Sequence, residues 1–264
     1  MNLFSKHETR RRILRGLDDS DMLQMLVGQW LQSPQGAQVL AAEQALVSPI
    51  VSRLFGYHIL QVGCHEDYSL IEDSPVGHKI IFSPSWRPGE QQAVADNEEL
   101  PLAADSMDVV VVHHALDFTE DSHRLLREVT RVLRPGGHML IVGFNPLSTW
   151  GLWKYCKRRV NIPWRGRFIS RGRLSDWLQL LDLQVEKFNY GLHFPPLAIA
   201  RLLKHAGRFE NLGTRLNSPF GGAYVVQCIK QVAPITPIRP RWQPIPVRPA
   251  AFPATENVRA KRLH

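Results

Sequence analysis

A run of β-branched residues, an amphipathic segment and a second apolar run together constrain the fold of this chain most. Residues 108–113 contain four consecutive valines, and residues 138–143 are again mostly apolar. A strand this apolar is usually covered on both faces, as parallel strands are. Between the two runs, residues 122–133 place leucines and valines at helical spacing, and a Pro-Gly-Gly turn at 135–137 ends the pattern. A strand, a helix and a strand within about 35 residues predict a right-handed βαβ unit in a parallel sheet.

Further segments with strand or helix periodicity lie on both sides of this unit. Strands are predicted at 58–63, 79–83, 184–190 and 223–229, and helices within 20–56, at 174–181 and at 196–209. The N-terminal helical region is expected to break at Ser33-Pro34. These elements predict an α/β protein.

The two ends of the chain differ in composition from its middle. From Pro234 onward, seven prolines are spread over a segment without a core pattern, which is typical of a disordered or extended chain. We therefore expect an N-terminal helical extension at 1–56, an α/β domain at 57–232 and a Pro/Arg-rich disordered tail at 233–264. The formal net charge of +8 follows the same division, because residues 1–17 carry +4 and residues 234–264 carry +5. The high isoelectric point is therefore weak evidence that the folded middle binds nucleic acid.

Cysteine usage and hydropathy predict where the protein resides. Cys64, Cys156 and Cys228 are odd in number, far apart and without metal-ligand spacing. This pattern favours a reducing compartment. The N-terminus lacks the apolar core of a secretory signal, and no run approaches the roughly 18 apolar residues of a membrane-spanning helix. We expect a cytoplasmic protein without a transmembrane segment.

Two sequence runs carry a resemblance to a known family. Residues 100–108 read Leu-Pro-Leu-Ala-Ala-Asp-Ser-Met-Asp before the valine strand, and residues 126–137 read Leu-Arg-Glu-Val-Thr-Arg-Val-Leu-Arg-Pro-Gly-Gly. Together they resemble the class I S-adenosylmethionine-dependent methyltransferases, in particular the type 11 group. A narrower run at 143–152, Gly-Phe-Asn-Pro-Leu-Ser-Thr-Trp-Gly-Leu, is similar to a poorly characterised bacterial branch of that group.

The resemblance implies a Rossmann-like class I methyltransferase fold, with a mostly parallel sheet and helices on both faces. It also implies S-adenosyl-L-methionine as the cofactor, bound across the carboxyl ends of the strands, and an unidentified methyl acceptor as the partner. Matching the motifs to this chain gives six expected cofactor-binding residues: Gly63, Cys64, Ser83, Asp96, Asn97 and His113.

The chain departs from the family pattern at two of these places. The family motif acidic-x-Gly-x-Gly-x-Gly corresponds to Gln-Val-Gly-Cys-His-Glu-Asp at 61–67, in which only Gly63 is kept. After the second strand, Ser83 stands near the place of the carboxylate that binds the ribose. A lost charge-assisted hydrogen bond costs roughly 1.5–3 kcal/mol. Two hypotheses follow: a methyltransferase acting on an unidentified acceptor, or a catalytically inactive relative that binds RNA or another anionic partner.

His113 and His114 end the valine strand at the expected active-site edge. Histidine can act as a general base near neutral pH, so both are catalytic candidates. The alternative is a structural role at the end of the strand. No third ligand accompanies them with metal spacing, so no metal site is predicted. The acids at 117, 120 and 121 are expected to form an acidic helix start instead of a catalytic cluster.

A basic and aromatic segment follows the last strand of the βαβ unit. Residues 154–173 contain eight lysines and arginines and no acid, and Trp150, Trp153, Tyr155 and Trp164 are interleaved with them. This composition suits an anionic acceptor, a nucleic-acid backbone or an anionic membrane surface. The alternative is a solvated loop whose aromatic side chains cover the core. Together with the tail, the 150–173 segment is the expected contact for a nucleic acid or other polyanion.

Overall fold

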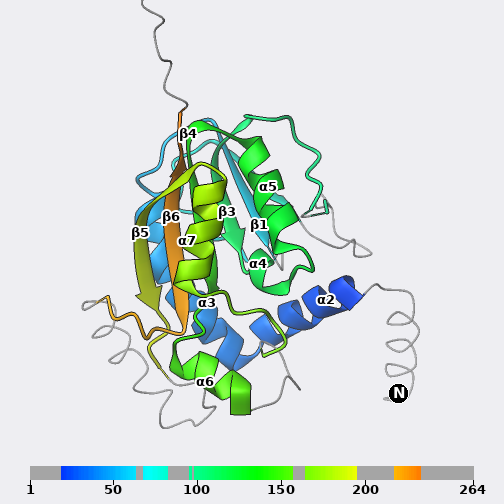
Figure 1. Ribbon diagram of the computed structural model, residues 1–264, viewed down its shortest axis with the longest axis vertical. Helices are drawn as coiled ribbons and strands as arrows, with labels where there is room; N and C mark the ends of the chain where they lie inside the picture. Colours follow the sequence, from blue (N-terminus) through cyan, green and yellow to red (C-terminus); the bar gives the residue numbers. More distant parts are fainter. Residues whose placement is uncertain are drawn as a thin grey trace, which may run out of the picture. The chain divides into compact units, whose positions relative to one another are not determined.

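Six strands form one sheet in the order β2-β1-β3-β4-β6-β5 (Figure 1). The computed structural model describes residues 19–63, 68–82, 95–96, 98–156, 164–194 and 217–232. The strands are β1 (His58–Gly63), β2 (His78–Phe82), β3 (Met107–His113), β4 (Leu133–Phe144), β5 (Leu183–Gly191) and β6 (Ala223–Lys230). Strands β2, β1, β3 and β4 are parallel, and β6 runs antiparallel between β4 and β5. The carboxyl ends of the four parallel strands therefore meet at one edge, and the predicted mostly parallel sheet is confirmed.

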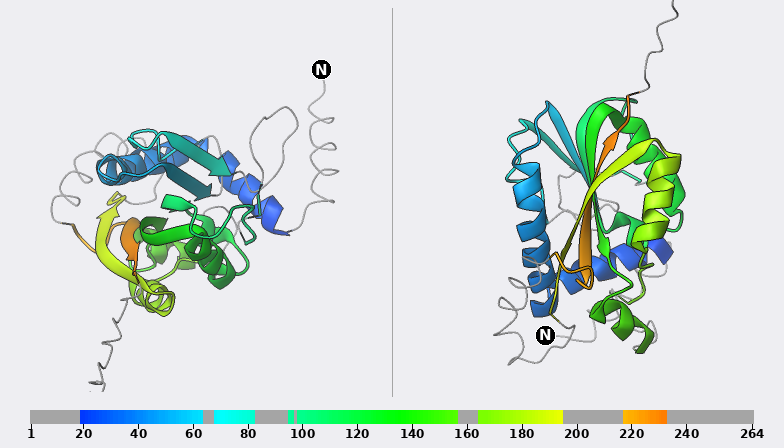
Figure 2. Two further views of the ribbon diagram at one scale, coloured as in Figure 1. Left: turned by 90° about the horizontal axis from the view of Figure 1, so that it is seen from above. Right: turned by 60° about the vertical axis from the view of Figure 1, so that its left-hand side comes forward.

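Helices cover both faces of the sheet, as the right-hand view of Figure 2 shows. They are α2 (Asp19–Leu31), α3 (Pro34–Val51), α4 (Ala115–Phe118), α5 (Ser122–Val132), α6 (Thr149–Cys156) and α7 (Arg171–Leu180). The valines of β3 divide between the two faces. Val110 and Val112 pack in the cluster that contains the leucines of α5 and α7, whereas Val109 and Val111 pack in the cluster that contains α3. This two-sided burial explains why β3 has no polar alternation.

The N-terminal helices are part of the same packing. The predicted break at Ser33-Pro34 separates α2 from α3. Ser33 is the N-cap of α3, because its side chain accepts a hydrogen bond from the Gly36 N–H at 3.1 Å. Val47 and Val51 of α3 are buried against the sheet. The described residues belong to one compact unit that ends at Val232. The division into 1–56, 57–232 and 233–264 stays a prediction, and the tail lies outside the described residues.

Helix α5 differs from expectation at both ends. Asp121, and not Ser122, is its N-cap, because its carboxylate accepts from the N–H groups of residues 123 and 124 at 3.0 Å. At the other end β4 already begins at Leu133, so the Pro-Gly-Gly turn lies within the assigned strand. Gly136 has φ +80°, a conformation that glycine adopts without strain. The helix expected at 196–209 lies outside the described residues.

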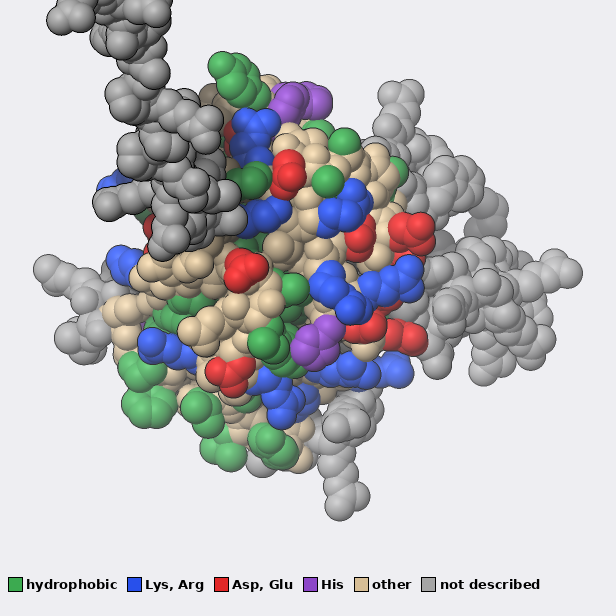
Figure 3. Space-filling model, turned by 45° about the horizontal axis from the view of Figure 1, so that its top comes forward, with side chains coloured by type: hydrophobic (Ala, Val, Ile, Leu, Met, Phe, Trp, Pro, Cys, Tyr) green, Lys and Arg blue, Asp and Glu red, His purple; other side chains and the backbone are tan. Residues whose placement is uncertain are grey.

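Ion pairs of α5 hold the Leu-Pro segment that carries the family resemblance. The Arg131 guanidinium donates to the carbonyls of Leu100 and Leu102 and to Glu128, and Glu128 accepts from the Leu100 N–H. The two motifs therefore bind each other, which gives them a structural role. On the face drawn in Figure 3, basic and acidic side chains are interspersed. Among the described helices, none is long and apolar enough to cross a membrane.

Candidate functional site at the carboxyl ends of β1 and β3

The last residues of β1 and β3 lie side by side at the carboxyl edge. Gly63 is paired with His113 in the parallel ladder. A Cβ at position 63 would lie 3.1 Å from the His113 carbonyl oxygen and 3.8 Å from its Nδ1. A side chain at position 63 would require His113 to move by a few tenths of an ångström, so Gly63 has a packing role besides the predicted one.

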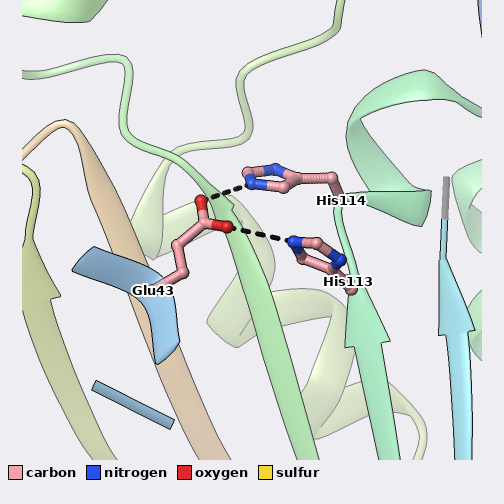
Figure 4. A group of neighbouring side chains, drawn as sticks. All are labelled: Glu43, His113 and His114. Atoms are coloured by element: carbon pink, nitrogen blue, oxygen red, sulfur yellow. Dashed lines mark hydrogen bonds and ion pairs between the residues drawn. The ribbon is translucent and has the colours of Figure 1, made fainter. Parts of the chain in front are cut away.

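A buried carboxylate joins both histidines at the end of β3 (Figure 4). Glu43 Oε2 lies 3.0 Å from His113 Nε2, and Glu43 Oε1 lies 2.6 Å from His114 Nε2. On its other side, His114 Nδ1 lies 2.7 Å from Asp117 Oδ2, which also accepts from the Phe144 N–H at 3.0 Å. All four side chains are essentially inaccessible to solvent.

The backbone at His114 brings the two neighbouring rings to one carboxylate. Successive residues of a strand normally point to opposite faces. His114 instead takes the left-handed conformation with φ 53°, which is uncommon outside glycine. Its ring stacks on Phe144 with centroids 4.1 Å apart. A strained backbone held by packing and three hydrogen bonds marks a site that the fold specifies closely.

The four groups set one another's charge. Burial opposes ionisation of Glu43, but the positive His114 and the hydrogen bonds from both histidines lower the Glu43 pKa to about 2. Burial likewise opposes the charge of His114, but Glu43 and Asp117 raise the His114 pKa to about 10. Burial lowers the pKa of His113 and raises the pKa of Asp117. At neutral pH the network holds an ionised Glu43, a protonated His114 and a neutral His113.

The two predicted catalytic residues, His113 and His114, differ in how their ring nitrogens are bonded. Both ring nitrogens of His114 are engaged, so it serves to position its neighbours. His113 Nδ1 is buried and has no hydrogen-bond partner among the residues that the structure describes. Asp117 lies in the first turn of α4, as expected of an acidic helix start, but its side chain also belongs to the buried network, and Asp121 caps α5.

Glu43 is the residue that sequence reasoning missed. It lies 70 positions before His113, on a helix face whose other buried neighbours are apolar. The available signal was an acid on the buried face formed by Val39, Ala42, Leu46 and Val47. Glu43, His113 and His114 also place ligand atoms within 4.8 Å of one another, close enough to share a metal ion. Direct hydrogen bonds account for the same atoms, and the prediction of no metal site remains untested.

The remaining predicted cofactor residues are only partly described. Asp96 is exposed, and its Oδ1 accepts from the Glu98 N–H at 2.8 Å in a turn that pairs with Glu99. Cys64, Ser83 and Asn97 lie outside the described residues. Gln61, which replaces the acid of the family motif, donates to the Tyr68 carbonyl and accepts from the Leu70 N–H. Its amide therefore holds the chain that returns after β1.

The aromatic residues of the basic segment mostly face the core. Trp150 and Trp164 are buried in a cluster at the end of β4, and Trp153 packs against that cluster. Lys154 lies over the Phe168 ring at 4.3 Å and donates to the Gly166 carbonyl. Tyr155, by contrast, is 79% exposed. The interpretation that these aromatic side chains cover the core is confirmed for the buried tryptophans.

Comparisons with known proteins place the chain among methyltransferases. The family model described as a methyltransferase domain matches residues 82–141. The uncharacterized protein YafS of Escherichia coli is 33% identical over 183 residues, which cover 69% of this chain and 73% of that protein. The phthiotriol/phenolphthiotriol dimycocerosates methyltransferase of Mycobacterium leprae is 31% identical over 115 residues, or 38% of this chain and 43% of that enzyme. The match therefore spans less than half of the mycobacterial enzyme.

A solved structure shows the same fold. A Thermotoga maritima protein, described as an S-adenosylmethionine-dependent methyltransferase and possible histamine N-methyltransferase, superposes with a TM-score of 0.57 at 19% identity. The superposition covers 79% of this chain and 98% of the other. The predicted Rossmann-like class I methyltransferase fold is confirmed.

Proposed function

This chain belongs to the class I S-adenosylmethionine-dependent methyltransferase family, and we propose that it transfers the methyl group to an acceptor held at the carboxyl ends of β1 and β3. The observation that carries the location is the unpartnered, buried Nδ1 of His113 beside Gly63. S-adenosyl-L-methionine, when bound, supplies a methyl group that its sulfonium already activates. The protein then has mainly to orient the reactants and exclude water.

The residues proposed to hold the cofactor divide among three parts of it. Gly63, Cys64 and His113 adjoin the amino-acid end, Ser83 the ribose, and Asp96 with Asn97 the adenine. The described atoms fit this assignment: His113 keeps an unused polar nitrogen, and Asp96 offers an exposed carboxylate that can accept from an amino group. Cys64, Ser83 and Asn97 are proposed on the resemblance alone.

Replacing Asp96 with alanine is expected to weaken binding of S-adenosylhomocysteine by roughly 10- to 100-fold, because one hydrogen bond to a charged group is lost. Isothermal titration of the two proteins with S-adenosylhomocysteine and with S-adenosylmethionine measures this. Asp176→Ala, which removes an exposed carboxylate from α7, is the matched control and should leave the affinity unchanged. Equal affinities of the wild-type and Asp96→Ala proteins would remove Asp96 from the site, and no binding of either ligand to the wild-type protein would contradict the proposed function.

We also propose that a polyanion binds the basic segment, supported by the exposed Arg165 and Arg173 and by the exposed ring of Tyr155. Retention on heparin should then be strong at low salt and fall steeply between about 50 and 200 mM salt. Double charge reversal, Arg165→Glu with Arg173→Glu, should lower the eluting salt concentration. Reversal of two exposed arginines outside the segment, Arg53→Glu with Arg127→Glu, changes the net charge by the same amount and is the control, and an equal effect of both double changes would argue against a specific site.

We propose a cytoplasmic location on the cysteine pattern, to which the buried free thiol of Cys228 adds support. Fractionation of cells that express the tagged protein tests this, and recovery in a membrane or periplasmic fraction would contradict it.

A further inference from the structure

We propose that Glu43 and His113 together bind the positively charged amino group of the cofactor. In this contact, His113 Nδ1 accepts the hydrogen bond from that group. The inference rests on the proposed cofactor binding and adds to it one contact, its chemical partner and the residue that supports it. Glu43 comes from the N-terminal helix α3, outside the region that the methyltransferase family model matches.

The geometry fixes which nitrogen of His113 carries the proton. Glu43 Oε2 lies 3.0 Å from Nε2, and an ionised carboxylate can only accept. Nε2 must therefore donate, which leaves Nδ1 of the neutral ring as an acceptor with a free lone pair. Burial, which keeps His113 neutral, acts in the same direction.

The accepting nitrogen faces the end of β1. Nδ1 is 3.8 Å from the position that a Cβ of Gly63 would take. Figure 4 shows the ring between Glu43 on one side and the end of β1 on the other. A buried acceptor without a partner is costly, and the described residues provide none for this atom. A ligand that brings a donor to this place would satisfy it.

The surroundings select a cationic donor. The Glu43 carboxylate makes Nδ1 of His113 a stronger hydrogen-bond acceptor, because a histidine that donates to a carboxylate becomes more basic at its other nitrogen. The positive charge of His114 is paired with the Glu43 carboxylate at 2.6 Å, and its other ring nitrogen is bonded to Asp117 at 2.7 Å. The Gln61 amide is engaged with Tyr68 and Leu70 and offers no charge of its own. An ammonium group suits such an acceptor, whereas a carboxylate would be repelled by its lone pair.

A pair of ligands that differ only in the amino group tests this contact. Isothermal titration would compare S-adenosylhomocysteine with its deamino analogue, which keeps the carboxylate. Wild-type protein should bind S-adenosylhomocysteine roughly 10- to 100-fold more tightly than the analogue. His113→Leu should bind the two ligands equally. His113→Asn, whose amide oxygen can replace Nδ1, should recover part of the preference.

Two further measurements separate the role in recognition from a role in folding. In wild-type protein, nitrogen NMR of the imidazoles should show Nδ1 of His113 without a proton, and S-adenosylhomocysteine should shift that signal. Glu43→Gln, which keeps the shape and removes the charge, should reduce the preference for the amino group. The NMR result needs no variant, so it stands even if His113→Leu fails to fold.

The outcomes distinguish this inference from the proposed function. If neither ligand binds wild-type protein, the proposed function fails and the inference falls with it. If S-adenosylhomocysteine binds but His113→Leu keeps the full preference, only the inference fails. A protonated Nδ1 would also overturn it. So would a stoichiometric metal ion in the purified protein that is lost in Glu43→Gln, since Nε2 would then be a metal ligand.

Discussion

Replacing Glu43 with alanine is expected to lower the free energy of unfolding by about 3–5 kcal/mol. The change removes the carboxylate that both histidines contact and leaves the protonated His114 in the core with Asp117 as its one remaining carboxyl partner. It also leaves His113 Nε2 without its acceptor. Chemical denaturation of the wild-type and variant proteins, followed by circular dichroism, measures the difference.

The size of this difference should depend on pH in both directions. The His114 pKa is raised from 6.5 to about 10, so its contribution is complete below pH 6.5 and is lost as the pH rises toward 10. The Glu43 pKa is lowered from 4.5 to about 2, so its contribution is complete above pH 4.5 and is lost as the pH falls toward 2. The wild-type advantage over Glu43→Ala should therefore be greatest between about pH 4.5 and 6.5.

A neighbouring side chain on the same helix provides the control. Gln44 makes one exposed hydrogen bond to Asp73 at 3.1 Å, and Gln44→Ala should cost at most about 1 kcal/mol with little pH dependence. If Glu43→Ala costs no more than this control, or if its effect is independent of pH, Glu43 is not an ionised partner of the histidines.

The sequence predicts the sheet well because the signal is local. Each buried strand is a short apolar run, and the valines of β3 need no partner to be recognised. Helix ends were less certain, since Asp121 and Ser122 are both good caps and only the backbone shows which accepts the hydrogen bonds. Local patterns thus predict the strands and the helices α3, α5 and α7 within a few residues, whereas α4 and α6 were not predicted.

The Glu43 network could not be predicted from spacing, because its members meet through the fold. His113 and His114 point to the same carboxylate only because His114 adopts a left-handed backbone conformation. Glu43 reaches them only because α3 packs across the face of β3. Neither fact leaves a sequence motif. The Asp117 carboxylate belongs here for the same reason: the Phe144 N–H that it accepts comes from the next strand of the sheet, β4.

The basic segment is a case in which composition left two interpretations open and packing decides between them. Trp150 has no accessible surface, its Nε1 donates to the Phe194 carbonyl at 2.8 Å, and its ring contacts Trp30, Phe144 and Trp164. Asn145 and Ser148, which precede α6, donate hydrogen bonds to nearby backbone carbonyls and fix the start of that helix. This part of the segment, rich in aromatic residues, therefore packs at the carboxyl end of β4.

Replacing Trp150 with alanine is accordingly expected to destabilise the protein by about 3–5 kcal/mol, because a fully buried indole leaves a cavity and the Phe194 carbonyl loses its donor. Denaturant unfolding measures this loss. Tyr155→Ala removes a large ring that is 79% exposed and belongs to the same helix. This change should alter stability by no more than about 0.5 kcal/mol.

The same two variants decide which aromatic side chain could contact a polyanion. A buried ring offers no face for base stacking, so Trp150→Ala should keep its salt-dependent elution from heparin under conditions where it remains folded. Tyr155→Ala should elute at lower salt if the exposed ring stacks on a ligand. Full stability of Trp150→Ala combined with lost heparin binding would reverse the assignment, since Trp150 would then belong to a recognition surface and not to the core.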